Sequence, residues 1–336
     1  MKVAFELSGE HETLPKAEVL GCLEAFDTCF KEVADLDMLF IIEIEEMPSI
    51  ASRLAMTHNI LEVLGFCPAD TDSIADLVGT VDLNLKKDET FCVRARQVKE
   101  HVLNISDLEK QAGAIIYKRG YRVDLKNPDV VFRLVLTQGK CAFGKLMYSV
   151  DRTQYESRRP HRRLFFHPGA LLPRVARALV NISSICEGGT LLDPFCGTGG
   201  ILIEAGLTGA RCIGADVQRK MVLGANTNLR HYGIGGELMI GDARNLGLAD
   251  NSVDAVVTDP PYGRSALFRA RSLEDLYDCS LKEIHRILRP GNKAVVVSQI
   301  PIEKIAEDAG FTTIGHHRQR VHKSLTRRII RLEKMR

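Results

Sequence analysis

The stretch Leu192-Asp193-Pro194-Phe195-Cys196-Gly197-Thr198-Gly199-Gly200 lies between an apolar segment and a segment with helical spacing. An apolar run that ends in an acid and a glycine-rich turn is typical of a buried strand followed by a helix. Glycines in the turn let a ligand approach the backbone, and the N-terminus of the helix offers unpaired N–H groups. The stretch therefore predicts a ligand-binding strand–turn–helix unit.

Residues 166–336 repeat this succession of strand, turn and helix. The alternation predicts a doubly wound, Rossmann-like parallel sheet that binds ligands at the carboxyl ends of its strands. The last two segments are expected to complete the sheet as an antiparallel hairpin. The predicted segments are Thr190–Asp193, Gly200–Leu207, Arg211–Asp216, Gln218–Tyr232, Leu238–Ile240, Val253–Asp259, Leu273–Leu288, Lys293–Ser298, Phe311–His316 and Arg327–Leu332.

Two cofactors fit the glycine-rich turn. A dinucleotide site needs a small residue where Leu202 stands, and the carboxylate of Asp193 would repel a pyrophosphate. The same carboxylate suits the sulfonium and ammonium of S-adenosylmethionine. Asp216, at the end of the next strand, is placed to accept the ribose hydroxyls, and Asp242, in Gly241-Asp242-Ala243, to bind the adenine amine. We predict an S-adenosylmethionine site and keep an NAD-dependent dehydrogenase as an alternative.

The strongest motif is Asp259-Pro260-Pro261-Tyr262-Gly263, at the end of the fourth predicted strand. An exocyclic amine on a base ring is a poor nucleophile because its lone pair is delocalised. The Asp259 carboxylate and the Pro260 carbonyl are suited to accept its N–H bonds, and the two prolines hold that pair rigid. Tyr262 offers a face on which a flipped-out base can stack. We therefore predict that Asp259, Pro260, Pro261 and Tyr262 are catalytic.

Residues 1–150 have the alternating pattern of two small α+β units, predicted over 1–50 and 51–150. Residues 151–165 follow, with basic side chains on both sides of Pro160 and little to bury, and predict a linker before the domain at 166–336. The predicted segments are Lys2–Leu7, Lys16–Phe30, Met38–Ile44, Thr90–Arg96, Ser106–Lys118, Val130–Leu136 and Cys141–Tyr148.

The formal net charge of +2 conceals an uneven distribution. Residues 1–75 contain 4 basic and 15 acidic side chains, residues 76–165 contain 18 and 11, and residues 166–336 contain 23 and 17. An acidic block followed by two basic blocks permits a polyanionic partner on part of the molecule. The cations expected to contact RNA phosphates are Arg94, Arg96, Lys118, Arg119, Arg158, Arg159, Arg162 and Arg163.

Several classes of protein are excluded by composition. No apolar run approaches the roughly 20 residues of a membrane helix, and we expect a cytoplasmic protein. The nine cysteines are scattered without a Cys-x-x-Cys pair, which predicts neither a disulfide framework nor a zinc site. No metal site is predicted. The segment 139–146 imitates a phosphate-binding loop, but Leu146 stands where a metal-binding hydroxyl is required.

The motifs Asp-Pro-Phe-Cys-Gly-Thr-Gly-Gly at 193–200 and Asp-Pro-Pro-Tyr-Gly at 259–263 together resemble those of the tRNA guanine-N2 methyltransferases that act on guanine 10. The resemblance implies a ferredoxin-like unit over 1–50, a THUMP domain over 51–150 that holds tRNA, and a catalytic domain that makes N2-methylguanine and N2,N2-dimethylguanine. It assigns the cofactor loop to 193–199 and the catalytic motif to 259–262. The implied cofactor contacts are Asp193, Phe195, Gly197, Gly199, Asp216 and Asp242, and we predict the neighbouring Cys196, Thr198, Val217 and Ala243 as cofactor contacts with them.

Some members of this family work with a small zinc-binding activator subunit that adds a strand to the catalytic sheet. In the expected strand order, Glu237–Ile240 is the exposed edge that such a subunit would extend. Three alternatives stay open beside the dehydrogenase: a tRNA guanine-6 N2-methyltransferase, a DNA adenine or cytosine amino-methyltransferase, and an RNA-binding module without catalysis.

Overall fold

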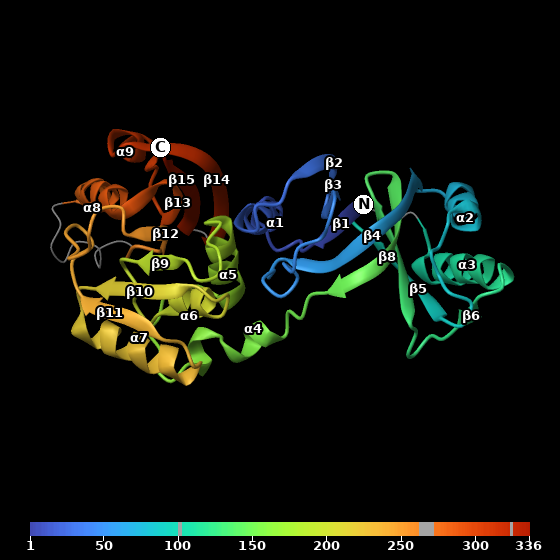
Figure 1. Cartoon of the computed structure of the whole chain (residues 1–336), viewed down its shortest axis with the longest axis horizontal. Helices are drawn as coiled ribbons and strands as arrows, with labels where there is room; N and C mark the ends of the chain where they lie inside the picture. The colour runs from blue at the N-terminus through green and yellow to red at the C-terminus, as the bar shows by residue number, and fades with distance from the viewer. Residues whose placement is uncertain (100–102, 262–271, 323–324) are drawn as a thin grey trace. The chain divides into compact units, whose positions relative to one another are not determined.

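The computed structural model describes residues 1–99, 103–261, 272–322 and 325–336. The chain divides into two compact units. The first contains residues 1–10, 28–52 and 56–151, and the second contains residues 11–27, 53–55 and 152–336. Figure 1 colours both along the chain. Among the described residues, no helix has the length and apolarity needed to cross a membrane.

The first unit is built on an eight-stranded sheet in the order β2-β3-β1-β4-β8-β7-β5-β6. Helices α2 and α3 pack against each other, and they cover β4 and β5 respectively. The chain returns through α3 between the parallel strands β5 and β7. The elements are β1 (Lys2–Leu7), β2 (Phe30–Leu36), β3 (Leu39–Ile44), β4 (Thr57–Pro68), α2 (Thr71–Thr80), β5 (Thr90–Gln97), α3 (Ile105–Lys118), β6 (Arg122–Val123), β7 (Val130–Thr137) and β8 (Lys140–Ser149).

Sequence predictions in this unit are confirmed, within one residue at either end, for β1, β3, β5, α3, β7 and β8. The pattern missed β2, which is exposed along most of its length and so lacks apolar alternation. Strand β1 pairs with β4 across the boundary expected at residue 50, so one sheet includes strands from both expected N-terminal units. The boundary at residue 50 stays a prediction.

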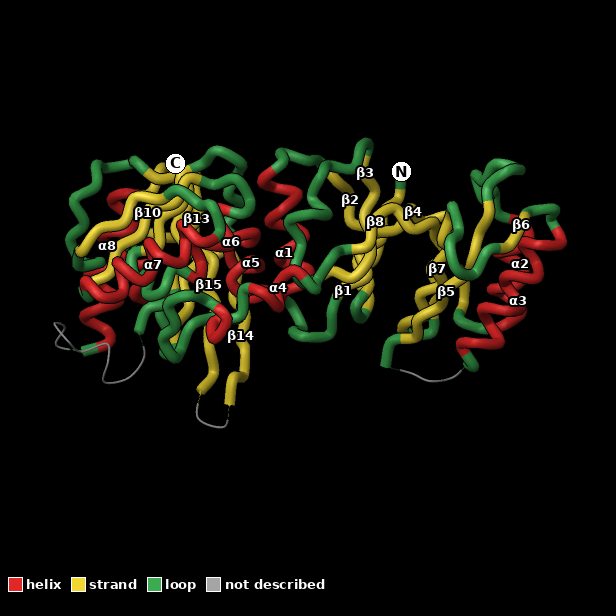
Figure 2. The backbone as a smooth tube through the Cα atoms, turned by 90° about the horizontal axis from the view of Figure 1, so that it is seen from below, coloured by secondary structure: helices red, strands yellow, loops and turns green. Residues whose placement is uncertain are grey.

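The second unit contains the predicted doubly wound sheet, in the order β11-β10-β9-β12-β13-β15-β14. Strands β11, β10, β9, β12 and β13 are parallel, and β14 and β15 form the predicted antiparallel hairpin at one edge. Figure 2 shows this hairpin extending beyond the other strands. The strands are β9 (Thr190–Asp193), β10 (Arg211–Asp216), β11 (Gly236–Ile240), β12 (Val253–Thr258), β13 (Leu288–Ser298), β14 (Phe311–His322) and β15 (Leu325–Lys334).

Helices cover both faces of this sheet. Helices α5, α6 and α7 pack on one face, while α8 and α9 enclose a buried apolar core on the other. The helices are α5 (Pro173–Ile182), α6 (Gly200–Gly206), α7 (Arg219–His231), α8 (Leu273–Ile287) and α9 (Glu303–Asp308). Helix α8 ends at Ile287, and Arg289-Pro290-Gly291 lies inside the following β13, where an irregular register between β12 and β13 accommodates it.

Helix α1 (Leu14–Ala25) comes from the N-terminal part of the chain but belongs to the second unit. It packs along α5, and the two backbones approach closely. A Cβ atom at Gly21 would lie 2.3 Å from the carbonyl oxygen of Asn181. Only a residue without a side chain permits this approach.

Buried polar groups hold α1 against α5. The Glu18 carboxylate accepts hydrogen bonds from the Asn181 amide and from the backbone N–H of Ala55, each at 2.9 Å. The Arg53 guanidinium donates to the Asn181 side-chain oxygen at 3.3 Å and to the Ile185 carbonyl at 2.9 Å. Glu18 and Asn181 are fully buried, so each group depends on the others. Residues 53–55 therefore belong to the second unit together with α1.

The segment 151–165 is not the solvated linker that its composition predicts. It contains the short helix α4 (Gln154–Ser157) and a 3-10 turn at Pro160–Arg162, and Tyr155 is 1% exposed. Arg158 is buried against Glu204 of α6, with Nε 2.8 Å from Oε1. The expectation that this segment has little to bury was wrong, because its arginines have a buried partner that is distant in the sequence.

The close approach of α1 and α5 gives a prediction. Gly21→Ala should lower the free energy of unfolding by roughly 1–3 kcal/mol, because the added methyl group meets backbone and not a flexible side chain. Gly113→Ala in α3 is the matched control: a Cβ there has open space, so the change should be neutral or stabilise by up to about 1 kcal/mol. Urea denaturation measures both. Equal effects of the two substitutions would contradict the packing of α1.

Candidate active site

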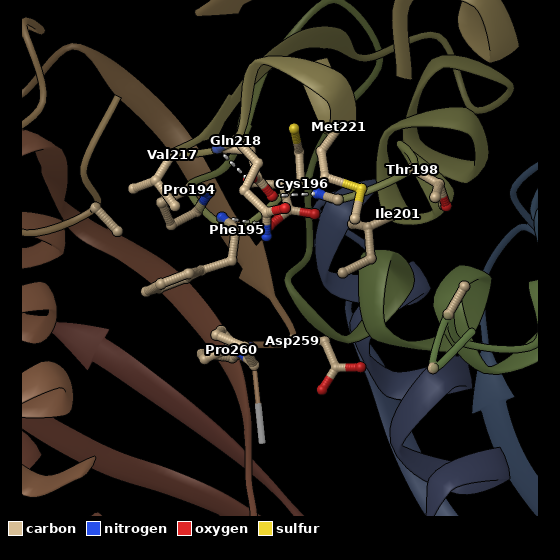
Figure 3. A pocket seen from close by; sticks show the side chains of 18 of the residues that line it. Pro194, Phe195, Cys196, Thr198, Ile201, Val217, Gln218, Met221, Asp259 and Pro260 are labelled. Carbon is tan, nitrogen blue, oxygen red and sulfur yellow. Dashed lines mark hydrogen bonds between the residues drawn. The ribbon is translucent and has the colours of Figure 1, made fainter. Parts of the chain in front are cut away.

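A cavity of about 560 Å³ lies at the carboxyl ends of β9, β10 and β12. The predicted acids from all three strand ends line it, together with Asp242 from the turn after β11. Figure 3 shows Asp259 and Pro260 on one side of the cavity and Val217 and Gln218 on the other. The structure therefore brings the predicted cofactor loop and the described part of the predicted catalytic motif to one site.

Asp193 is the most deeply buried acid of the site, with 1% of its surface exposed. Its Oδ1 accepts hydrogen bonds from the Thr258 hydroxyl at 2.8 Å and from the Phe195 backbone N–H at 3.1 Å. Burial raises the pKa of Asp193 to about 7, and the nearby carboxylates of Asp259 and Asp216 act in the same direction. Within the described residues, Oδ2 has no hydrogen bond, which leaves it available to a donor in the cavity.

The turn after β9 has the backbone conformations that its glycines allow. Gly197 has φ of 49° and Gly199 has φ of 79°, and both values are costly for residues with a side chain. A Cβ at Gly199 would also lie 2.7 Å from Leu229. The N–H of Cys196 donates to Ala215 of β10 at 2.8 Å, which fixes the turn against the neighbouring strand.

Asp216 and Asp242 are held by local hydrogen bonds. The Asp216 carboxylate accepts from the N–H groups of Gly197 at 3.1 Å and Gln218 at 2.8 Å, and burial raises its pKa. Asp242 pairs with Arg244, whose Nη2 lies 2.7 Å from Oδ2. A carboxylate has about four acceptor positions, so Asp216, which uses two of them here, keeps capacity for a ligand. Val217 and Ala243 line the cavity next to them.

The predicted catalytic motif follows β12 directly. Pro260 is buried, and Asp259, Pro260 and Pro261 all line the cavity. Tyr262 lies outside the described residues, so its predicted stacking role stays a prediction. The described residues contain no group of three or more His, Cys, Asp and Glu side chains placed to hold a metal ion.

Sequence reasoning missed several residues of the site. Thr258 is fully buried and donates to Asp193, and its position just before Asp259 was the available signal. The segment 167–171, Met221 of α7 and Leu276 of α8 also line the cavity. Apart from His167, these residues are small or apolar and have no distinctive spacing, so only the fold brings them to the site.

The cofactor loop is also supported from behind by the segment before α5. Asn228 is fully buried in α7, and its amide donates at 2.9 Å to the carbonyls of both Thr198 and Phe165. Its oxygen accepts from the N–H of Phe165 at 2.9 Å. Arg163 lies 3.5 Å from the Thr198 hydroxyl and donates to the Arg158 carbonyl at 3.0 Å. The residues before α5 therefore position the turn at Thr198.

This placement changes the expectation for the linker arginines. Arg158 and Arg163 are 7% and 5% exposed and are bonded within the protein, so the structure does not support phosphate contacts by either. Arg162 is exposed, and Arg159 pairs at the surface with Glu156. Only these last two remain candidates in this segment.

The cations of the first unit that were predicted to contact RNA also differ in their exposure and in their partners. Arg96 pairs with the buried carboxylate of Glu6 at 3.0 Å, which gives it a structural role. Arg94 and Arg119 donate to backbone carbonyls at 2.9 Å and 2.8 Å but stay partly exposed. Lys118 is exposed on α3.

Comparison with known proteins gives two family matches and several full-length relatives. The chain matches the RMKL-like methyltransferase domain over residues 160–329 and the THUMP domain over residues 68–144. It is 37% identical to the tRNA (guanine(10)-N2)-dimethyltransferase of Methanothermobacter thermautotrophicus, with 100% of both chains covered. It is 34% identical to the enzyme of the same name from Pyrococcus abyssi, with 96% of each covered.

More distant relatives share less. The tRNA (guanine(6)-N2)-methyltransferase of Archaeoglobus fulgidus is 25% identical, and the match covers 71% of this chain and 69% of that one. Among solved structures, TrmN from Thermus thermophilus has a TM-score of 0.57 at 21% identity, with 100% of both chains covered. That likeness concerns the fold.

The raised pKa of Asp193 gives a prediction for the cofactor-free protein. A carboxyl whose pKa rises from 3.8 to about 7 on folding favours the folded state at low pH. That contribution should be lost, at roughly 1.4 kcal/mol per pH unit, between about pH 4 and pH 7. Asp193→Asn keeps both hydrogen-bond acceptor positions of Oδ1 but cannot ionise, so its free energy of unfolding should fall less over this range.

Chemical denaturation at pH 5, 6, 7 and 8 measures the difference. Asp72→Asn, at an exposed position in the first turn of α2, is the matched control and should retain the wild-type pH dependence. The same pH dependence in Asp193→Asn and in the wild type would exclude the buried carboxyl as its source.

Proposed function

The chain belongs to the family of the tRNA (guanine(10)-N2)-dimethyltransferases, and from this premise we infer that it methylates the exocyclic N2 amine of guanine 10 in tRNA. The donor is S-adenosylmethionine, and the products are N2-methylguanosine and then N2,N2-dimethylguanosine. The observation that best supports the reaction is the convergence of Asp193, Asp216 and Asp259 on one cavity at the carboxyl edge of the sheet. Cytoplasmic localisation is part of the same proposal.

The carboxylates that line the cavity fit a cofactor with positive charge. When bound, S-adenosylmethionine supplies an electrophilic methyl group on a sulfonium. The Asp193 carboxyl is buried without a cationic partner among the described residues, and a cationic ligand would stabilise its charged form. Asp216 is assigned to the ribose hydroxyls and Asp242 to the adenine amine. Phe195, Cys196, Gly197, Thr198, Gly199, Val217 and Ala243 complete the assigned cofactor contacts.

The residues after β12 are assigned to the target amine. The Asp259 carboxylate and the Pro260 carbonyl accept its two N–H bonds, which localises the nitrogen lone pair for attack. Pro260 and Pro261 contribute no N–H donor of their own, and their fixed φ angles keep the acceptors in position before the substrate arrives. Tyr262 is assigned to stacking on the flipped-out base.

We assign delivery of tRNA to the THUMP domain and to cations of both units. The match to the THUMP model over 68–144 supports this, because Arg94, Lys118 and Arg119 lie within it and are at least partly exposed. Arg159 and Arg162 precede the catalytic core and are also accessible. Guanine 10 is preferred over guanine 6 because the guanine-10 enzymes are more similar and are covered more completely.

The proposal is tested by incubating tRNA transcripts with the protein and S-adenosylmethionine and analysing the nucleosides by mass spectrometry. We expect N2-methylguanosine and N2,N2-dimethylguanosine at position 10. Asp259→Ala should reduce kcat by at least about 100-fold, with the affinity for S-adenosylmethionine nearly unchanged. Asp250→Ala, at an exposed position before β12, is the control and should retain activity.

Three outcomes would contradict parts of this assignment. Modification at position 6 would overturn the target position, and methylation of duplex DNA instead of tRNA would overturn the substrate class. Near-wild-type turnover by Asp259→Ala would overturn the role of that carboxylate.

A small zinc-binding activator subunit is a further part of the proposal. Strand β11 forms an edge of the catalytic sheet, and Ile240 on it is 57% exposed, so backbone groups and apolar surface are both available for an added strand. If such a subunit from the same organism binds here, hydrogen exchange should slow at residues 236–240 on mixing. Binding without protection of that segment would place the contact elsewhere.

A further inference from the structure

The β14–β15 hairpin presents a row of cations on one face. Arg318 and Arg328 are directly opposite each other, and Arg320 follows two residues after Arg318 and therefore points to the same face. Arg318 and Arg320 are exposed, and Arg328 is partly exposed. We call these three residues the hairpin arginines. No ion pair to any of them occurs within the described residues.

Several cations elsewhere in this sheet and its helices are paired. Lys293 and Arg331 both contact Glu24 of α1, Arg289 pairs with Asp254, and Arg286 pairs with Asp250 and Glu283. Like charges directly opposite each other on neighbouring strands destabilise a sheet. The pair Arg318 and Arg328 therefore has an electrostatic cost that a bound anion would remove.

The strand register places the hairpin arginines at the same end of the sheet as the cavity, beyond the carboxyl ends of the parallel strands. Thr258, just before Asp259, is level with Val296 of β13, and Arg328 is opposite Ser298, two residues further towards that edge. Arg320 is opposite Thr326, two residues further again. Figure 2 shows the hairpin continuing past the ends of the other strands.

The distance between the hairpin and the cavity suits contact with a nucleotide next to the target guanine. Strand β15 lies two strands from β12 and β14 lies three, which corresponds to about 10 and 14 Å at normal strand spacing. A base that is flipped into the cavity leaves its backbone outside, with the flanking phosphates near the rim. Guanidinium groups at this distance are in reach of those phosphates.

We infer that the hairpin arginines bind the phosphate backbone of the RNA strand next to the target guanine. The inference rests on the proposed function. The ligand chemistry is a pair or short run of phosphates, which guanidinium groups bind in a bidentate manner. The hairpin thus positions the strand from which the base is extruded, while Asp259 and Pro260 act on the base itself.

The test compares two triple variants with the same change of charge. The first is Arg318→Gln, Arg320→Gln and Arg328→Gln. The control is Arg211→Gln, Arg230→Gln and Arg336→Gln. It removes three exposed cations of the same unit at the end of the strands that is away from the cavity. For wild type and both variants, KM for tRNA is measured as a function of salt, together with kcat and the affinity for S-adenosylmethionine.

We expect the hairpin variant to raise KM for tRNA by about tenfold or more and to lower the slope of log affinity against log salt by about 2. The affinity for S-adenosylmethionine should stay unchanged, which shows that the unit is folded. The control variant should differ from wild type by less than about twofold in KM.

The outcomes separate the two levels of inference. If wild-type protein does not methylate tRNA, the proposed function fails. If wild type is active and the hairpin variant has an unchanged KM and salt slope, the hairpin inference fails and the proposed function stands. Equal loss of tRNA affinity in both triple variants would also overturn it, since the effect would then be one of net charge.

Discussion

The second unit is organised around a carboxylate that is buried at the end of β9. Removing an anion from water is costly unless hydrogen bonds or an opposite charge compensate. Asp193 accepts hydrogen bonds from Thr258 and Phe195, and Thr258 is the last residue of β12, just before Asp259. The bond that stabilises the buried acid thus also fixes the end of β12 beside the cofactor loop. The proposed cofactor and substrate groups are held in one rigid arrangement.

Helices α5 and α6 of the same unit depend on polar groups from distant parts of the chain. Glu204 of α6 is fully buried and is neutralised by Arg158 and Arg177. Asn181, on the same helix as Arg177, bonds to Glu18 of α1 and to Arg53. Removing residues 1–150 would therefore expose α5 and leave Asn181 without these partners. The N-terminal sequence is needed by the catalytic unit itself, apart from any role in binding RNA.

The motifs at the strand ends were predictable because each combines a short, local pattern with a regular succession of elements. The carboxylates at 193, 216 and 259 and the glycines at 197 and 199 all lie where the sequence places them. Helix α1 was predicted within a few residues at its ends, but its sequence does not say that it packs against α5. That information depends on contacts between residues more than 100 positions apart, such as Glu18 and Asn181.

The linker arginines show the same limit for charge. Composition alone cannot distinguish an arginine that contacts solvent from one that neutralises a buried acid. A local signal was present: Glu204 lies between Ile203 and Ala205 in an apolar helix, and a buried acid requires a cationic partner. Arg158 and Arg163 were counted in the basic block of residues 76–165, yet their charges are enclosed by the protein.

A segment total of charge therefore says little about where an anion can bind. What matters is whether each cation has an acid beside it once the chain is folded. In the second unit, Glu24 of α1 neutralises two cations of the sheet, Lys293 and Arg331. Where neighbouring elements reach the hairpin, they contact other groups: His11 and Thr13, just before α1, bond to the Arg318 carbonyl and to His317, and Glu303 of α9 lies beside His316. Among the described residues, no acid forms an ion pair with Arg318, Arg320 or Arg328, so the hairpin keeps charge for an outside anion.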